Sequence, residues 1–233
     1  MHSRLTLAAA LGALALGGAL APPAHSAELP IPQLGGGHQV AVESMQAVRF
    51  RGVERQALDF SCGSAAVATL LNYHYQHKTD EATVFAGMFA ASDQERVRQE
   101  GFSMLDMQSY LRSIGYRADG FNLETERLAM LGVPAIVLID TGGYLHFVVI
   151  KGLRDGEVLV GDPALGLRAY TMSAFEEIRR GPLFIVRDRP DLAQRLFNQE
   201  TEWAARTRPP YNEALKSQSV AQFLVDLPRP GTW

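Results

Sequence analysis

The spacing of apolar residues changes near residue 134 and divides the chain into a helical part and a strand part. Between residues 62 and 131, apolar side chains recur every three or four positions, which predicts helices. These are expected over residues 62–75, 80–89, 103–115 and 124–131. From residue 134 the alternation has a period of two and predicts strands over residues 134–139, 144–151, 157–160, 168–171 and 183–186. Helices followed by antiparallel strands indicate an α+β domain, with N-terminal helices packed on a C-terminal antiparallel sheet.

Two of the helix starts carry local signals of their own. Ser103 is followed three residues later by Asp106, the spacing of a capping box, and Gly115 is placed to end that helix. Ser61 is placed to cap the helix over 62–75, which is rich in small apolar residues. This helix is therefore expected to be buried on most sides.

The first 27 residues have the layout of a secretory signal peptide. Arg4 precedes an apolar stretch over residues 5–20, and a Pro-Pro pair then breaks the helix before a stretch of small residues. Cleavage is expected after Ser26 or Ala27; the alternative is a single membrane anchor. No later stretch reaches the roughly 18 apolar residues that a membrane span needs. The mature protein is therefore expected in the periplasm.

The segments on either side of the central domain differ from it in composition. Gly35 to Gly37 predicts a flexible stretch, and residues 38–50 alternate as in one or two short strands. The charged C-terminal end is expected to be helical over 193–212 and 213–225, and to pack against the domain or a partner. The predicted organisation is a signal peptide over residues 1–27, an approach segment over 28–52, one domain over 53–189 and a helical tail over 190–233.

Composition excludes several classes of protein and draws attention to one residue. The 233 residues carry 22 Lys and Arg against 25 Asp and Glu, so the net charge of −3 argues against a nucleic-acid binder. A single cysteine excludes a disulfide scaffold. In an oxidising compartment an unpaired Cys62 is either buried and inert or retained for its chemistry.

The residues around Cys62 favour a reactive thiol over a buried, inert one. A cysteine attacks as a thiolate, and Cys62 begins a buried helix, where the helix dipole and free N–H groups favour a negative charge. Gly63 is expected to let a substrate backbone come close. The side-chain amide of Gln56, six residues upstream, can donate to the same oxyanion as the Cys62 backbone N–H.

The base is expected from the sheet. His146 lies in the strand over 144–151, and the next strand ends at Asp162. If a five-residue loop centred on Arg154 joins the strands, Asp162 lies opposite His146 with Cβ atoms about 5 Å apart and orients the imidazole. A two-residue turn at Asp155-Gly156 would shift the pairing by three residues and remove this argument.

Each residue alone is weak evidence, whereas their order along the chain is a stronger signal. His146 by itself is more typical of a satisfied core histidine, and Asp162-Pro163 of a turn. His74 and His77 share a helix face, but no acidic or cysteine ligands accompany them. No metal or cofactor is therefore expected.

Several stretches together resemble the C39 peptidases, papain-like cysteine peptidases that cleave leader peptides after a Gly-Gly pair. The resemblance runs from about residue 53 to 186 and rests on Arg55-Gln56, Asp59-Phe-Ser-Cys-Gly63, Gly101-Phe-Ser-Met-Leu-Asp106, Pro134-Ala-Ile-Val, His146-Phe-Val-Val149 and Asp162-Pro-Ala-Leu-Gly166. It implies a papain-like fold, with Cys62 as nucleophile, His146 as general base, Asp162 as its orienting partner and Gln56 in the oxyanion hole. Two departures are Ser64, where the family usually has Pro, and Ser61, where many members have Asp.

The context of the domain also departs from the family's commonest form. The sequence shows no transmembrane bundle and no phosphate-binding loop, so no attached transporter is expected. It is similar to the free-standing periplasmic C39-like peptidases that accompany outer-membrane export systems, such as the functional amyloid (Fap) system. This similarity implies a polypeptide substrate, such as exported amyloid subunits or a secretion-system component, and no nucleic-acid partner.

Other functions stay open on the sequence alone. The domain could be a non-cleaving adaptor that holds an extended segment, or an amidase or acyltransferase acting on a non-protein substrate with the same residues. It could also be a structural domain with an inert thiol. Gly35 to Gly37 is either a linker or a self-processing site.

Overall fold

Residues 27–28 and 41–206 are the part of the chain described by the computed structural model. The chain divides into two units, Met1–Ser44 and Met45–Trp233. In the first, β1 (Ala27–Glu28) pairs antiparallel with β2 (Ala41–Val42). The predicted signal peptide up to residue 26, Gly35 to Gly37 and the predicted helix over 213–225 lie outside the described residues. Within the described ranges, no helix is long and apolar enough to cross a membrane.

The second unit is built on a six-stranded sheet in the order β3-β8-β4-β5-β6-β7, with every neighbouring pair antiparallel. The strands are β3 (Ala118–Phe121), β4 (Ala135–Asp140), β5 (Leu145–Arg154), β6 (Glu157–Asp162), β7 (Gly166–Thr171) and β8 (Arg179–Val186). The five strands expected from the alternation are all present. The short β3, which contains Asp119 and Gly120, was not expected, because four residues with poor strand formers give no alternation.

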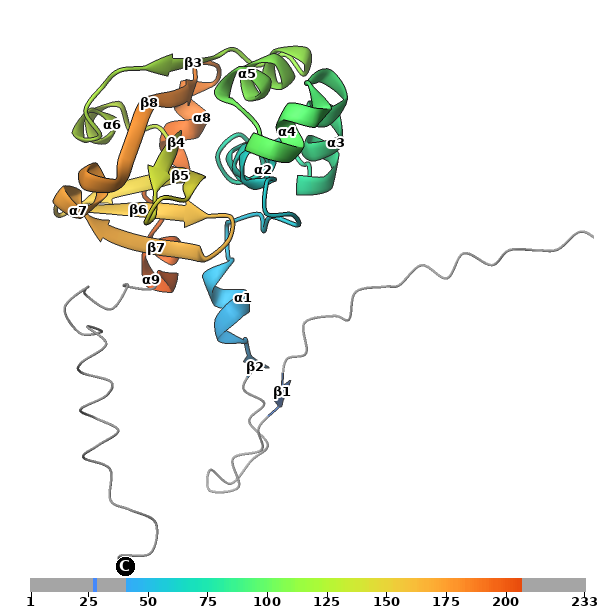
Figure 1. Cartoon of the computed structure of the whole chain (residues 1–233). Coiled ribbons are helices and arrows are strands. Elements are labelled where there is room, and N and C mark those ends of the chain that lie inside the picture. Colours follow the sequence, from blue (N-terminus) through green and yellow to red (C-terminus); the bar gives the residue numbers. More distant parts are fainter. Residues whose placement is uncertain (1–26, 29–40, 207–233) are drawn as a thin grey trace, which may run out of the picture. The chain divides into compact units, whose positions relative to one another are not determined.

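Helices α2 to α5 gather on one side of Figure 1, beside the sheet. The helices are α1 (Met45–Arg49), α2 (Cys62–His74), α3 (Glu81–Ala91), α4 (Gln94–Glu100), α5 (Met104–Ser113), α6 (Glu126–Leu131), α7 (Met172–Ile178), α8 (Pro190–Arg195) and α9 (Glu200–Ala205). The α+β class is confirmed. The capping box is also confirmed, because Ser103 and Asp106 satisfy each other's backbone N–H groups at the start of α5.

Three local expectations were wrong. Residues 45–49 form α1 where alternation had predicted a strand. Val48 and Phe50 both pack against a small apolar cluster. Ser61 precedes α2, but its hydroxyl bonds to Leu58 instead of capping the helix. The helix predicted over 193–212 is interrupted, because α8 ends at Arg195 and Asn198, with φ of 61°, lies between it and α9.

Two apolar clusters hold the unit together. The larger lies between α2 and the central strands, and all of α2 except Asn72 and Tyr73 is buried, as expected. The smaller cluster contains Val53, Leu159, Leu167 and Trp203 of α9. Trp203 has no exposed surface, so the described part of the tail packs against the domain. Burial of one large aromatic side chain contributes several kcal/mol, on the order of 3–5 by comparison with truncation to alanine.

Candidate active site

Cys62 is the first residue of α2, and only 7% of its surface is exposed. Its backbone therefore lies where the free N–H groups and the positive end of the helix dipole favour a negative charge. Ser64 donates to the Ser61 carbonyl (2.8 Å) and to the buried Glu81 carboxylate (3.0 Å). The serine that departs from the family pattern thus ties the start of α2 to α3.

Gly63 allows close packing at the start of α2. A Cβ atom at Gly63 would lie 3.0 Å from Cβ of Phe102 and 3.2 Å from Cε of Met107. The missing side chain therefore lets α2 pack closely against these two residues. The approach of a substrate backbone to Gly63 stays a prediction.

His146 and Asp162 form a buried pair next to this helix start. The His146 Nε2 atom lies 2.9 Å from Asp162 Oδ1, and the two residues are 3% and 2% exposed. The same carboxylate oxygen accepts from the backbone N–H groups of Ala164 (2.8 Å) and Leu165 (3.0 Å). The turn after β6 thus fixes the carboxylate, and the carboxylate in turn fixes the imidazole.

The strand register that brings this pair together differs from the expected one. A two-residue turn at Asp155 and Gly156 joins β5 to β6, so Arg154 pairs with Glu157. The register then shifts by one between Ile150 and Gly152, which leaves Lys151 as an extra residue in β5.

The bulge at Lys151 determines which side of the sheet His146 faces. Beyond the bulge Val149 pairs with Gly161, so Asp162 falls opposite Val148 and on the same face as His146, as its diagonal neighbour. Without the extra residue the alternation would place His146 on the other face. The predicted directly opposite pairing was wrong, but the two side chains meet.

The electrostatics of the pair favour a protonated imidazole. Burial lowers the pKa of His146, but the hydrogen bond and charge of Asp162, together with the interaction with Cys62, outweigh it and raise the pKa from 6.5 to about 9. The ring nitrogen that Asp162 does not use, Nδ1, is buried without a hydrogen-bond partner among the described residues. At neutral pH the imidazole beside Cys62 therefore carries a positive charge.

Gln56 is tied to the same turn as Asp162. Its backbone N–H donates to the Pro163 carbonyl (3.0 Å), and its side-chain Nε2 donates to the Leu58 carbonyl (3.1 Å). Its Oε1 atom is buried without a hydrogen-bond partner in the described part of the chain. The loop before α2 and the turn after β6 are thus held together at the site.

Sequence reasoning missed Tyr144. Its ring stacks on the His146 imidazole with centroids 5.9 Å apart and an angle of 28° between the planes, and its hydroxyl donates to the Asp59 carbonyl (2.9 Å). It therefore covers one side of the imidazole and links the sheet to the loop before Cys62. An aromatic residue two positions before the histidine was the available signal, since alternate residues share a strand face.

Cys62 lines a cavity of about 590 Å³ whose other walls come from both halves of the fold. They include Phe102 just before α5, Met104 of α5, Leu138 of β4, and Tyr144. An apolar cavity of this size with a cysteine in its wall can accommodate an extended segment of polypeptide.

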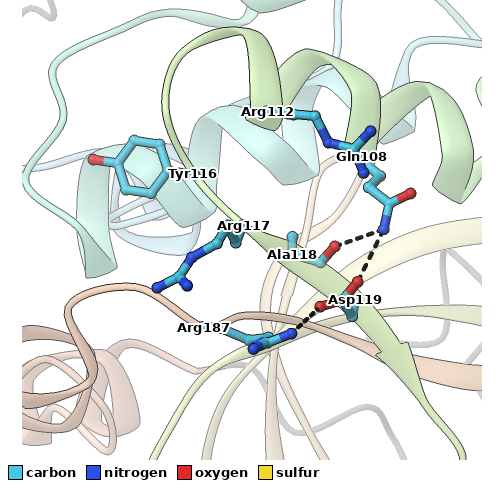
Figure 2. A pocket seen from close by; sticks show the side chains of 7 residues that line it. All are labelled: Gln108, Arg112, Tyr116, Arg117, Ala118, Asp119 and Arg187. Carbon is cyan, nitrogen blue, oxygen red and sulfur yellow. Dashed lines mark hydrogen bonds and ion pairs between the residues drawn. The ribbon is translucent and has the colours of Figure 1, made fainter.

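A second cavity, of about 310 Å³, lies at β3 and does not involve these residues (Figure 2). Two of the arginines around it are neutralised: Arg187 by Asp119 (2.8 Å) and Arg117 by Asp188 (2.7 Å). None of its lining residues is a cysteine, serine or histidine.

No group of three or more potential metal ligands occurs in the described ranges. His74 ends α2, whereas His77 lies beyond the helix and contacts the Tyr116 hydroxyl through Nδ1 (3.4 Å). The two histidines therefore do not share a helix face, which corrects the sequence-based placement.

Comparison with known proteins identifies the family to which this site belongs. Residues 51–191 match the peptidase C39 family. The chain is 45% identical over 164 residues to the "probable functional amyloid protease FapD" of Pseudomonas aeruginosa, covering 70% of this chain and 73% of that protein. It is 38% identical over 192 residues to the protein of the same name from Pseudomonas fluorescens, covering 81% and 85%.

Solved structures resemble the domain more distantly. One is a double glycine motif protease from an AMS/PCAT transporter in complex with the leader peptide, with 26% identity, a TM-score of 0.48 and coverage of 57% of this chain and 89% of that one. Another is the peptidase domain of Streptococcus ComA, with 17% identity, a TM-score of 0.49 and coverage of 57% and 96%.

Proposed function

The chain belongs to the peptidase C39 family of cysteine peptidases, and on that premise we propose that it cleaves exported polypeptides of a functional amyloid system, in the periplasm and after Gly-Gly pairs. The observation that carries the proposal is the buried His146–Asp162 pair next to Cys62, at an apolar cavity. The amyloid context is supported by the two relatives named FapD. The Gly-Gly preference is supported by the motifs shared with double-glycine leader peptidases.

In the proposed reaction Cys62 is the nucleophile. Its thiolate attacks the carbonyl carbon of the scissile bond, and the carbonyl oxygen becomes an oxyanion. The Cys62 backbone N–H and the second N–H of the Gln56 amide, which Leu58 does not occupy, stabilise that charge. The His146 imidazolium donates its proton to the amine nitrogen, the C–N bond breaks, and a thioester remains.

His146 then acts as the base. A water molecule gives a proton to Nδ1 and attacks the thioester carbon, which releases the acid and regenerates the sulfur as a thiolate. Asp162 accepts from Nε2–H throughout and so keeps Nδ1 directed to the reacting atoms. An adaptor that only binds an extended segment has no need for a buried histidine–aspartate pair beside its thiol, so the peptidase is favoured.

The test is cleavage of a quenched fluorescent peptide that contains one Gly-Gly pair, with an Ala-Ala peptide as its matched comparison. We expect Cys62→Ala and His146→Ala to lose at least about a thousandfold in kcat while remaining folded. His77→Ala removes a histidine remote from the site and serves as the control. Substantial cleavage by Cys62→Ala would overturn the proposed nucleophile, and equal cleavage of both peptides would overturn the Gly-Gly preference.

The proposed location has a separate test. The layout of an export segment over residues 1–27 supports the periplasm. Fractionation of cells that express the full chain is expected to place it with periplasmic markers, and deletion of residues 2–26 is expected to retain it in the cytoplasm. Cytoplasmic recovery of the full chain would contradict the proposal.

A further inference from the structure

Lys151 has no exposed surface, and three partners hold its ammonium group. Nζ donates to the Gly52 carbonyl (2.8 Å), forms an ion pair with Glu202 Oε1 (2.9 Å) and lies 3.2 Å from His74 Nε2. Burial, followed by the Lys151 charge, lowers the pKa of His74 well below 6.5, so its neutral imidazole accepts this hydrogen bond. Of the three, only Glu202 carries a charge opposite to that of Lys151.

Lys151 is also the extra residue of the bulge in β5, on which the position of His146 depends. Its aliphatic stem lies against Gly161, the residue before Asp162: a Cβ atom there would be 2.8 Å from Lys151 Cδ. The buried lysine therefore contacts both strands of the His146–Asp162 pair. A change in the position of Lys151 shifts the register that brings the pair together.

The tail satisfies the backbone of this bulge. The Lys151 carbonyl accepts from the Asn198 backbone N–H (2.9 Å), outside the strand ladder. The Asn198 side chain donates to the Leu153 carbonyl (3.1 Å) and accepts from Trp203 Nε1 (3.2 Å). A Cβ atom on Gly152 would collide with Asn198, so that glycine allows the close approach of the tail.

We infer that Asn198 and Glu202, here called the C-terminal clamp, position His146 against Asp162 by holding the β5 bulge at Lys151. The clamp lies beyond residue 191, where the match to the peptidase C39 family ends. Glu202 supplies the negative charge that compensates Lys151, and the backbone N–H of Asn198 donates to the Lys151 carbonyl. These are positioning residues, and the inference rests on the roles proposed above for His146 and Asp162.

The physical reason is the cost of a buried charge. When one partner of a buried ion pair is removed, the other is left uncompensated, which strongly destabilises the packing around it. If Lys151 moves, its backbone follows, and the bulge that sets the face and register of His146 loosens. The hydrogen bond between His146 and Asp162 then lengthens, and its contribution to the protonation of His146 falls.

The test measures the pKa of His146 by NMR in Glu202→Gln, with Glu200→Gln as the matched control. Glu200 lies on the same helix but is 77% exposed and pairs with Arg154 at the surface. We expect the pKa of His146 to fall by at least about half a unit in Glu202→Gln, with kcat reduced severalfold and KM within about twofold. Glu200→Gln is expected to match the wild type.

Asn198→Gly is the second variant and guards against two confounding outcomes. It keeps the backbone N–H that binds the Lys151 carbonyl but removes the side-chain bonds to Leu153 and Trp203 that hold Asn198 beside the bulge. It removes no charge, so a lower pKa of His146 cannot result from lost attraction, and glycine tolerates the positive φ of this residue. It also keeps the test decisive if Glu202→Gln does not fold. An unchanged pKa of His146 in the folded variants would overturn the clamp. A wild type with a raised pKa of His146 but no peptide cleavage would instead overturn only the proposed function.

Discussion

Replacing Asp162 by Asn tests how the site keeps His146 protonated. The amide retains Oδ1, which can still accept from the N–H groups of Ala164 and Leu165, so the turn after β6 is expected to persist. The variant removes the negative charge beside the imidazole. The change is therefore almost purely electrostatic.

The structure gives the size of the expected effect. The pKa of His146 rises from 6.5 to about 9 although burial lowers it, so Asp162 and Cys62 together supply at least about 3 kcal/mol in favour of the charged form. Asp162 contributes more than Cys62. Loss of its charge is expected to lower the pKa of His146 by at least about one unit, or more than about 1 kcal/mol.

The assay is alkylation of Cys62, the single cysteine of the chain, by iodoacetate between pH 5 and 10. This anionic reagent reacts fastest when a thiolate and an imidazolium coexist, so the rate falls as pH rises through the pKa of His146. The wild type is expected to lose reactivity near pH 9, and Asp162→Asn below about pH 8. Asp119→Asn, at the remote cavity of Figure 2, is the control. Coincident alkaline limbs in Asp162→Asn and wild type would refute the reasoning.

Four further outcomes are expected. Gln56→Ala lowers kcat by about 10²–10³ with little change in KM, measured on the Gly-Gly peptide, because one oxyanion donor is lost; an unchanged kcat would remove Gln56 from the mechanism. Trp203→Ala lowers the free energy of unfolding in urea by about 3–5 kcal/mol, because it empties a fully buried site; a loss below 1 kcal/mol would contradict that packing. Gly166→Ala destabilises by more than about 1 kcal/mol, since φ is +81° and a Cβ atom would lie 2.5 Å from the Arg49 carbonyl; wild-type melting would argue against this close approach. The wild type loses about 3 kcal/mol of stability between pH 6 and 9.5, because the pKa of His146 is about 9 when folded and 6.5 when unfolded, so its contribution is complete below pH 6.5 and disappears as pH rises through 9; urea titrations of His146→Ala should lack that loss.

Local rules accounted for most of the elements. The capping box at Ser103 and the buried helix that begins at Cys62 were both predictable, since caps and helix faces involve residues within a few positions of one another. The start of α2 also placed a cysteine where a helix favours negative charge. The same rules failed at α1, where alternation of Val48 and Phe50 was mistaken for a strand.

The sequence by itself determined two things: the family to which the chain belongs, and the order of Gln56, Cys62, His146 and Asp162 along it. Both depend only on residue type and position along the chain. Only the tertiary structure decided how His146 meets Asp162. The bulge at Lys151 sets that contact, and residues distant in the chain hold the bulge in place. A buried charge and a strand register depend on which segments pack together in space, and spacing along the chain does not record this.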